Sequence, residues 1–300
     1  MLQQALRTGR IATDDENQIK QILDTVGTMI KDIPMDRPPT ETGNIIYRLI
    51  REITGVDDPY KDIKSANIKE VLALYPDLKQ MVNNSRDRLL KAIRLAIAGN
   101  VIDFGVNKEF NIPQAVKQTI IQDFAILDME IFRDQLEKAQ SVLYLGDNAG
   151  ESVFDKLLIE ELGKPVIYVV RDGPVINDVT MEDAVESGID QVAEIISSGS
   201  PAPATVLSLC NDQFLKHFAN ADMIISKGQG NYESLSGVNR SIFFLLKAKC
   251  HLIANHLGVR ENDIVLKAMN IRDSIDDSNR SINKLSNQKE IEQTGGQHNE

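Results

Sequence analysis

Apolar residues recur at helical spacing through the first 138 residues. The clearest stripe runs from Ile19 to Ile30 and follows Thr13-Asp-Asp-Glu16, which fits a capping box at the start of a helix. A second stripe opens at Ser85 and ends at Gly99-Asn100, where we expect a C-cap. A third helical region is expected over 113–138, with Pro113 in its first turn. The first part of the chain is therefore predicted to be mostly α-helix.

From Ser141 onward, short apolar runs alternate with helical segments. The runs are too short for helices, and they are continuous rather than alternating, as expected of strands buried on both faces. They lie at 141–145, 165–170, 193–196, 223–225, 242–246 and 251–254. The helical stretches between them include 151–162, 180–187 and 203–219. Strand and helix in alternation predict a mainly parallel sheet with right-handed crossovers, in a three-layer α/β/α arrangement.

These patterns divide the chain into three parts. We expect a helical domain over residues 1–138 and an α/β/α core over 139–277 that binds metal and phosphate. The last residues, 278–300, are polar and contain few apolar side chains. They are expected to be a partly disordered tail, because so little apolar surface cannot offset the entropy lost on ordering.

The composition is that of a globular protein. Of 300 residues, 42% are hydrophobic, yet no apolar run approaches the roughly 20 residues of a membrane span. The N-terminus lacks the order of a secretory signal, so we expect a cytoplasmic protein that binds no membrane. A net charge of −11 argues against nucleic acid as a partner. Cys210 and Cys250 lack the spacing of zinc or redox motifs and are expected to be free thiols.

Polar residues follow the first two predicted strands. Asp147 and Asn148 come after the first, and Asp178 comes after the second. Ligands of open parallel sheets bind at the carboxyl ends of the strands, and oxygen donors suit Mg²⁺ or Mn²⁺. The alternative is that both segments are turns, the second leading to a helix capped by Thr180. Their position after successive buried strands favours a metal site.

A glycine-rich segment follows the fourth predicted strand. Its glycines let backbone N–H groups approach a ligand, and its lysine adds a positive charge, which together indicate an anion cradle. It consists of Lys227, Gly228, Gln229, Gly230 and Asn231. An ordinary glycine-rich turn is the alternative, and no nucleotide-binding fingerprint occurs. Asp222 begins the preceding strand and is expected to be structural.

Four further residues are candidates for substrate contacts. Ser198 and Gly199 follow the third predicted strand, and Lys247 follows the fifth. Asn100 opens the segment to Gly105 and could contribute at a cleft between the domains. For each, a turn or a solvated side chain is the alternative. Glu151 stands where a helix begins, so capping is the favoured role there.

Four segments together resemble the damage-control phosphatase family, long catalogued as a domain of unknown function and related to the protein called acidic residue methyltransferase. The segments are Leu145-Gly-Asp-Asn-Ala-Gly-Glu151, Pro174-Val-Ile-Asn-Asp-Val-Thr180, Ser198-Gly199 and Asp222-Met-Ile-Ile-Ser-Lys-Gly-Gln-Gly-Asn-Tyr-Glu233. Asp58-Pro-Tyr60 and Ala98 to Gly105 are similar to its microbial stand-alone members. The chain departs from many of these members because it does not begin with a Cys-x-x-Cys pair.

The resemblance implies a helical N-terminal region packed on a Rossmann-like core. It implies a Mg²⁺, Mn²⁺, Co²⁺ or Ni²⁺ ion held by Asp147, Asn148 and Asp178. It also assigns the lysine-led loop from Lys227 to Asn231 and the later Lys247 to the substrate. The expected activity is metal-dependent hydrolysis of phosphate monoesters of small metabolites, such as sugar phosphates, phosphopantetheine-like compounds or damaged phosphometabolites, with Asp147, Asp178 and Lys227 as catalytic residues.

Two questions stay open at this point. The nucleophile is either water, which we favour because no Asp-x-Asp signature is present, or Asp147 or Asp178 itself. The function could instead be non-catalytic binding of a phosphometabolite or metal. Carboxyl methyl transfer is a weaker alternative, because Gly146 to Gly150 is a poor match to an adenosyl-cofactor loop. The four histidines lack zinc-hydrolase spacing, and no G-x-S-x-G motif occurs.

Overall fold

The computed structural model describes residues 1–33, 39–101 and 118–271. The tail expected over 278–300 lies outside the described residues, as do residues 102–105 of the motif that begins at Asn100. The side chain of Asn100 also lies outside this description, although its backbone belongs to a helix.

In the described residues, seven strands form one sheet in the order β1-β7-β6-β5-β2-β3-β4. Every neighbouring pair is parallel except β6 and β7, so β1 and β7 run against the other five strands. The carboxyl ends of β2 to β6 therefore share one edge, as predicted. The strands are β1 (Phe124–Leu127), β2 (Val142–Leu145), β3 (Val166–Val170), β4 (Glu194–Ser197), β5 (Met223–Lys227), β6 (Ile242–Lys247) and β7 (Ile264–Met269).

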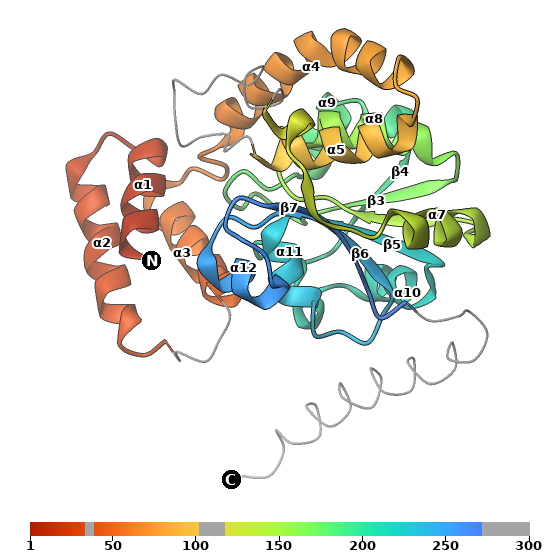
Figure 1. The fold of residues 1–300 in the computed structure, drawn as a ribbon. Coiled ribbons are helices and arrows are strands. Elements are labelled where there is room, and N and C mark those ends of the chain that lie inside the picture. Colours follow the sequence, from red (N-terminus) through yellow and green to blue (C-terminus); the bar gives the residue numbers. More distant parts are fainter. Residues whose placement is uncertain (34–38, 102–117, 272–300) are drawn as a thin grey trace.

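Helices cover both faces of the sheet, which confirms the α/β class with a mainly parallel sheet (Figure 1). Val142 and Tyr144 of β2 face one layer, and Leu143 and Leu145 face the other, which explains why the run is apolar without interruption. The first layer contains α4 (Lys61–Asn83), α5 (Arg88–Val101), α7 (Met129–Lys138), α8 (Ser152–Leu162) and α9 (Met181–Glu186). The second contains α10 (Asp212–Asn220), α11 (Gly228–Leu235) and α12 (His251–Leu257).

The N-terminal region is helical, as expected. Helices α1 (Leu2–Ala12), α2 (Glu16–Ile30) and α3 (Pro39–Thr54) share a small core of their own and lie beside the sheet (Figure 1). Helix α2 begins later than the predicted capping box: Asp15 is its N-cap and accepts a hydrogen bond from the Asn17 amide. No helix in the described part of the chain is both long enough and apolar enough to cross a lipid bilayer.

Three predicted elements are wrong. The expected strand at 251–254 is helix α12, which ends at Gly258 in the left-handed conformation. Residues 124–127, expected to be helical, form the edge strand β1. The helix expected from 203 starts only at Asp212, after a bend in which Ala204 has a φ of 63° and a 3₁₀ turn at Leu207–Leu209. Short apolar runs fit a buried helix turn as well as a strand, so periodicity alone does not separate them.

Candidate metal and phosphate site

The loops that follow β2 and β3 lie side by side. Asn148 and Asp178 form an isolated antiparallel bridge. The Val179 amide donates to the Asp147 carbonyl and the Ala149 amide donates to the Asn177 carbonyl, each across 2.8 Å. The structure thus brings together the three residues predicted to hold a metal. Their role as ligands stays a prediction.

The first turn of α11, which directly follows β5, contacts the loop after β2. Gly228 has a φ of 79°, and a Cβ atom there would lie 1.8 Å from Asp147 Oδ2. The Asp147 carboxylate therefore rests directly on the backbone of Gly228. Any larger residue would displace the carboxylate or the loop.

Four carboxylates are buried at the site, and the buried cations beside them are Arg171 and Lys227. Burial, followed by Glu151 and Asp178, raises the pKa of Asp147 well above its usual range. Burial also raises the pKa of Asp178, although Arg171 works against this shift. The four carboxylates are Asp147, Glu151, Asp155 and Asp178.

Arg171, which the sequence interpretation missed, holds Asp178 in place. Its Nε atom donates to Asp178 Oδ2 across 2.8 Å, and its Nη2 atom donates to the Gly146 carbonyl and to Asn231. The sequence signal was its position directly after the predicted strand that ends at Val170. Its complete burial, which is unusual for an arginine, is visible only in the structure.

Lys227 is enclosed in the protein interior and does not reach the surface of the site. Its side chain is fully buried, and its Nζ atom lies 2.5 Å from Asp155 Oδ1 and 3.2 Å from Glu151 Oε2. The hydroxyls of Tyr144 and Tyr168 also donate to Asp155. The predicted contact of Lys227 with substrate stays a prediction, and its burial between carboxylates does not favour it.

Glu151 also has a different environment from the one expected. It is the N-cap residue of α8, at the helix start where it was expected, but its side chain makes no capping hydrogen bond. Its Oε1 atom instead accepts a hydrogen bond from Asn148 Nδ2 across 2.5 Å. Sequence alone shows a carboxylate in the first helical turn and does not show which way it turns.

The rest of the predicted cradle is largely engaged within the protein. Asn231 donates to the carbonyls of Gly146 and Lys227 and accepts from the Thr205 amide. Gln229 accepts from the Lys249 amide. What remains for an anion is the first turn of α11, Gly228 to Gly230, where the N-cap residue contributes no side-chain hydrogen bond.

The other predicted substrate contacts, Ser198, Gly199, Lys247 and Asn100, have different environments. The Ser198 hydroxyl is buried and accepts from the Ser200 amide, and Gly199, with a φ of 75°, packs on Asn211, so both build the turn after β4. Lys247 is half-buried at the end of β6, and burial, then the neighbouring Lys249, lowers its pKa. The side chain of Asn100 lies outside the described part of the structure.

Helix α3, which lies outside the sheet, approaches the site. The ring of Pro203 would contact a Cβ atom on Gly43 of α3 at 3.2 Å, so this helix lies against the bend next to Ala204, whose amide donates to Asp178. Burial, then Tyr60 and Asp178, raises the pKa of the Tyr47 hydroxyl on the same helix. Helix α3 therefore forms a wall beside the predicted metal ligands.

The donor set suits a hard divalent cation. In the part of the chain that the structure describes, no three His, Cys, Asp or Glu side chains are arranged to hold a metal on their own. Two carboxylates, Asp147 and Asp178, are completed by the amide of Asn148, an oxygen donor that Mg²⁺ and Mn²⁺ accept.

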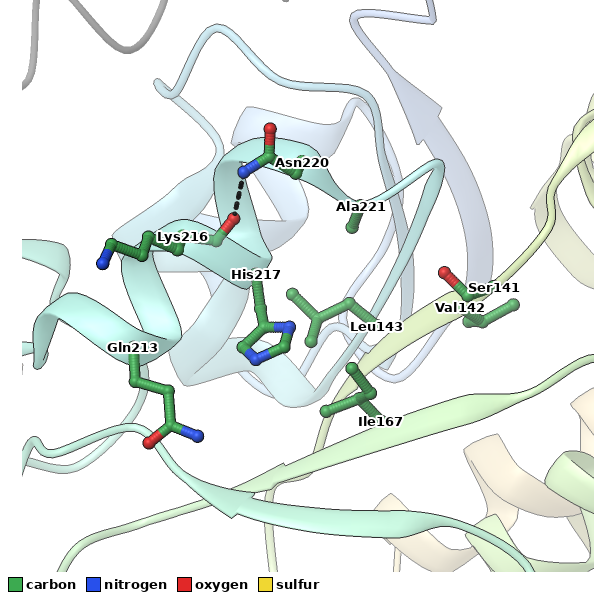
Figure 2. A pocket seen from close by; sticks show the side chains of 9 residues that line it. All are labelled: Ser141, Val142, Leu143, Ile167, Gln213, Lys216, His217, Asn220 and Ala221. Carbon is green, nitrogen blue, oxygen red and sulfur yellow. Dashed lines mark hydrogen bonds between the residues drawn. The ribbon is translucent and has the colours of Figure 1, made fainter.

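A hollow of about 570 Å³ lies elsewhere, at the amino ends of β2 and β3. Figure 2 shows His217 of α10 among the residues that line it, with Leu143 and Ile167 close by. None of the predicted site residues lines this hollow. Because ligands of open parallel sheets bind at the carboxyl edge, we place the functional site there.

Comparison with known proteins identifies relatives over nearly the whole chain. A family model described as the damage-control phosphatase ARMT1-like domain matches residues 1–265. An uncharacterized protein of Methanocaldococcus jannaschii is 35% identical over 279 residues, covering 89% of this chain and 92% of its own. Damage-control phosphatases of Pyrococcus horikoshii and Archaeoglobus fulgidus are 32% and 34% identical over 272 residues, covering 88% and 87% of this chain and 94% and 93% of their own.

A solved structure agrees with the fold. The crystal structure of a DUF89 family protein from Pyrococcus horikoshii superposes with a TM-score of 0.80 at 30% sequence identity. The match covers 89% of this chain and 95% of that one.

Proposed function

The chain belongs to the damage-control phosphatase family, and we propose that it hydrolyses phosphate monoesters of small metabolites with the help of a divalent metal ion. One observation carries the metal dependence. The structure brings two buried carboxylates, Asp147 and Asp178, together with the amide of Asn148, and oxygen donors of this kind suit a divalent ion. The names of the Pyrococcus and Archaeoglobus relatives support the phosphatase activity.

Asp147, Asn148 and Asp178 would hold the ion, which is Mg²⁺, Mn²⁺, Co²⁺ or Ni²⁺. Such an ion supplies charge stabilisation for phosphoryl oxygens and makes bound water more acidic. Asp178 is kept in place by Arg171, and the Asp147 carboxylate is kept in place by the backbone of Gly228.

The phosphate would be held by groups of the chain at the same edge of the sheet. The amides from Gly228 to Gly230 begin α11, whose N-cap side chain makes no capping bond, and the N-terminal end of a helix attracts anions. Lys247 stands at the end of β6, and the charge of the exposed Lys249 reaches Asp147. We assign these groups, rather than the buried Lys227, to the substrate.

Hydrolysis would proceed by in-line attack of water on phosphorus. A carboxylate of the site would accept the proton of the attacking water while the bond from phosphorus to the leaving oxygen breaks, and that proton would pass to the departing alcohol. The non-phosphate part of the substrate would face α3, where Tyr47 lies near Asp178.

Phosphate release tests the proposal. The purified protein should release phosphate from an aryl phosphate, or from members of a panel of sugar and pantetheine phosphates, only with Mg²⁺, Mn²⁺, Co²⁺ or Ni²⁺ present. A chelator should stop the reaction, and fresh metal should restore it. Absence of turnover with all four ions would overturn the proposal. Binding of Mn²⁺ and phosphate without turnover would favour a non-catalytic binding protein instead.

A further inference from the structure

The amide of Asn148 has a defined orientation. Its Nδ2 atom donates to Glu151 Oε1 across 2.5 Å and lies 3.3 Å from Asp147 Oδ2. Both acceptors lie on the nitrogen side of the amide, which leaves Oδ1 to turn the other way. A cation needs that oxygen, because an amide NH₂ group offers it no lone pair.

Glu151 is in turn held by Lys227. Its Oε2 atom accepts from Lys227 Nζ across 3.2 Å, while its Oε1 atom accepts from Asn148. The same ammonium lies 2.5 Å from Asp155 Oδ1, and all three charged side chains are fully buried. A continuous set of hydrogen bonds therefore joins Lys227 to Asn148.

We propose that Lys227 is a positioning residue of the metal site: it fixes Glu151, and Glu151 orients the Asn148 amide so that its oxygen faces the ion. This inference rests on the proposed function. Lys227 has no exposed surface, so contact with a phosphate would require it to give up its buried ion pairs with Glu151 and Asp155.

Removal of the Lys227 side chain should weaken metal binding and should not directly weaken substrate binding. Without the ammonium, Glu151 and Asp155 lose the cation that lies between them, and Glu151 loses the ion pair that holds it toward Asn148. Loss of groups that orient metal ligands typically lowers metal affinity by about 10- to 100-fold.

The test measures Mn²⁺ binding directly, by titration of the metal-free protein with the free ion followed by electron paramagnetic resonance. Lys227→Met should raise the Mn²⁺ dissociation constant about 10- to 100-fold. At saturating Mn²⁺ its KM for the aryl phosphate should equal that of the wild type. Lys247→Met should show the reverse pattern, with unchanged Mn²⁺ affinity and a raised KM. Lys216→Met, an exposed lysine on α10, is the matched control and should change neither.

Glu151→Gln covers the case in which Lys227→Met does not fold. It keeps the shape of the side chain and leaves Lys227 paired with Asp155, and it should also weaken Mn²⁺ binding. The Lys227→Met/Glu151→Gln double variant should bind Mn²⁺ no more weakly than the weaker single variant, because both changes interrupt one path.

Two results in the variants would overturn the inference. One is wild-type Mn²⁺ affinity in Glu151→Gln, or in folded Lys227→Met. The other is a raised KM at saturating metal in Lys227→Met with unchanged metal binding, which would make Lys227 a phosphate contact. Weakened Mn²⁺ binding in both variants of a protein that never releases phosphate would support the inference and reject the phosphatase. A wild type that does not bind Mn²⁺ would reject both.

Discussion

Arg171 Nε donates a hydrogen bond to Asp178 Oδ2 across 2.8 Å, and both side chains are buried. The same guanidinium reaches the Gly146 carbonyl, so one residue at the end of β3 holds the loops that carry Asp178 and Asp147. A buried cation thus organises one side of the site, as Lys227 does on the other.

Arg171→Met should destabilise the protein by about 3 to 5 kcal/mol, because it leaves Asp178 buried without its charged partner. Urea unfolding followed by circular dichroism would measure the change. Arg133→Met is the matched control: Arg133 pairs with Asp87 at the surface, where such a pair contributes about 1 kcal/mol or less. Equal losses in the two variants would contradict the role given to Arg171.

Gly228→Ala should abolish tight Mn²⁺ binding and phosphate release. The new Cβ atom would lie 1.8 Å from Asp147 Oδ2, at a residue whose φ of 79° disfavours any side chain. Gly237→Ala, where a Cβ atom meets nothing within 4 Å, should retain both properties. Normal turnover in Gly228→Ala would show that the Asp147 carboxylate does not need its present position.

Asp147→Ala and Asp178→Asn should each lower phosphate release to background while the protein remains folded. Asp222→Asn is the control, since Asp222 accepts from the amides of Gln140 and Ser141 at the start of β2 and should not affect turnover. Phosphate release at each Mn²⁺ concentration would be compared with the wild type. An active Asp147→Ala/Asp178→Asn double variant would remove the site assignment.

Lys64 links α4 to α9, and its contribution to stability should depend on pH. Its Nζ atom lies 2.7 Å from Asp183 and 2.8 Å from Asp58. Burial alone would lower the pKa of Lys64, but the two carboxylates outweigh it and raise the pKa above its ordinary value. The stabilisation is therefore complete below a pH of about 10 and is lost as the pH rises through the folded-state pKa.

Melting temperatures of the wild type and Lys64→Met should accordingly differ most at neutral pH and converge above pH 10. Lys61→Met serves as the control, because Lys61 pairs with Glu182 at the exposed surface. A difference that grows with alkaline pH would contradict the sign of the effect.

The apolar runs were sufficient to predict the centre of the sheet. Strands β2, β3 and β5 are buried on both faces, and that environment requires continuous apolar sequence whatever surrounds it. The positions of Asp147, Asn148 and Asp178 at one edge follow from the same pattern, because parallel strands end together. Strand β7 and the short edge strand β1 were missed, since their pairing depends on neighbours distant in the chain.

The directions of the charged side chains depended on packing between distant segments. Lys227, Glu151 and Arg171 each stand at a strand end or in a first helical turn, where a charged residue commonly faces solvent. Their burial follows from Asp155 on α8, from the Gly146 carbonyl and from the adjoining loops, which close around them only in the folded chain. A buried charge is stable only where specific partners meet it, and local periodicity carries no information about those partners.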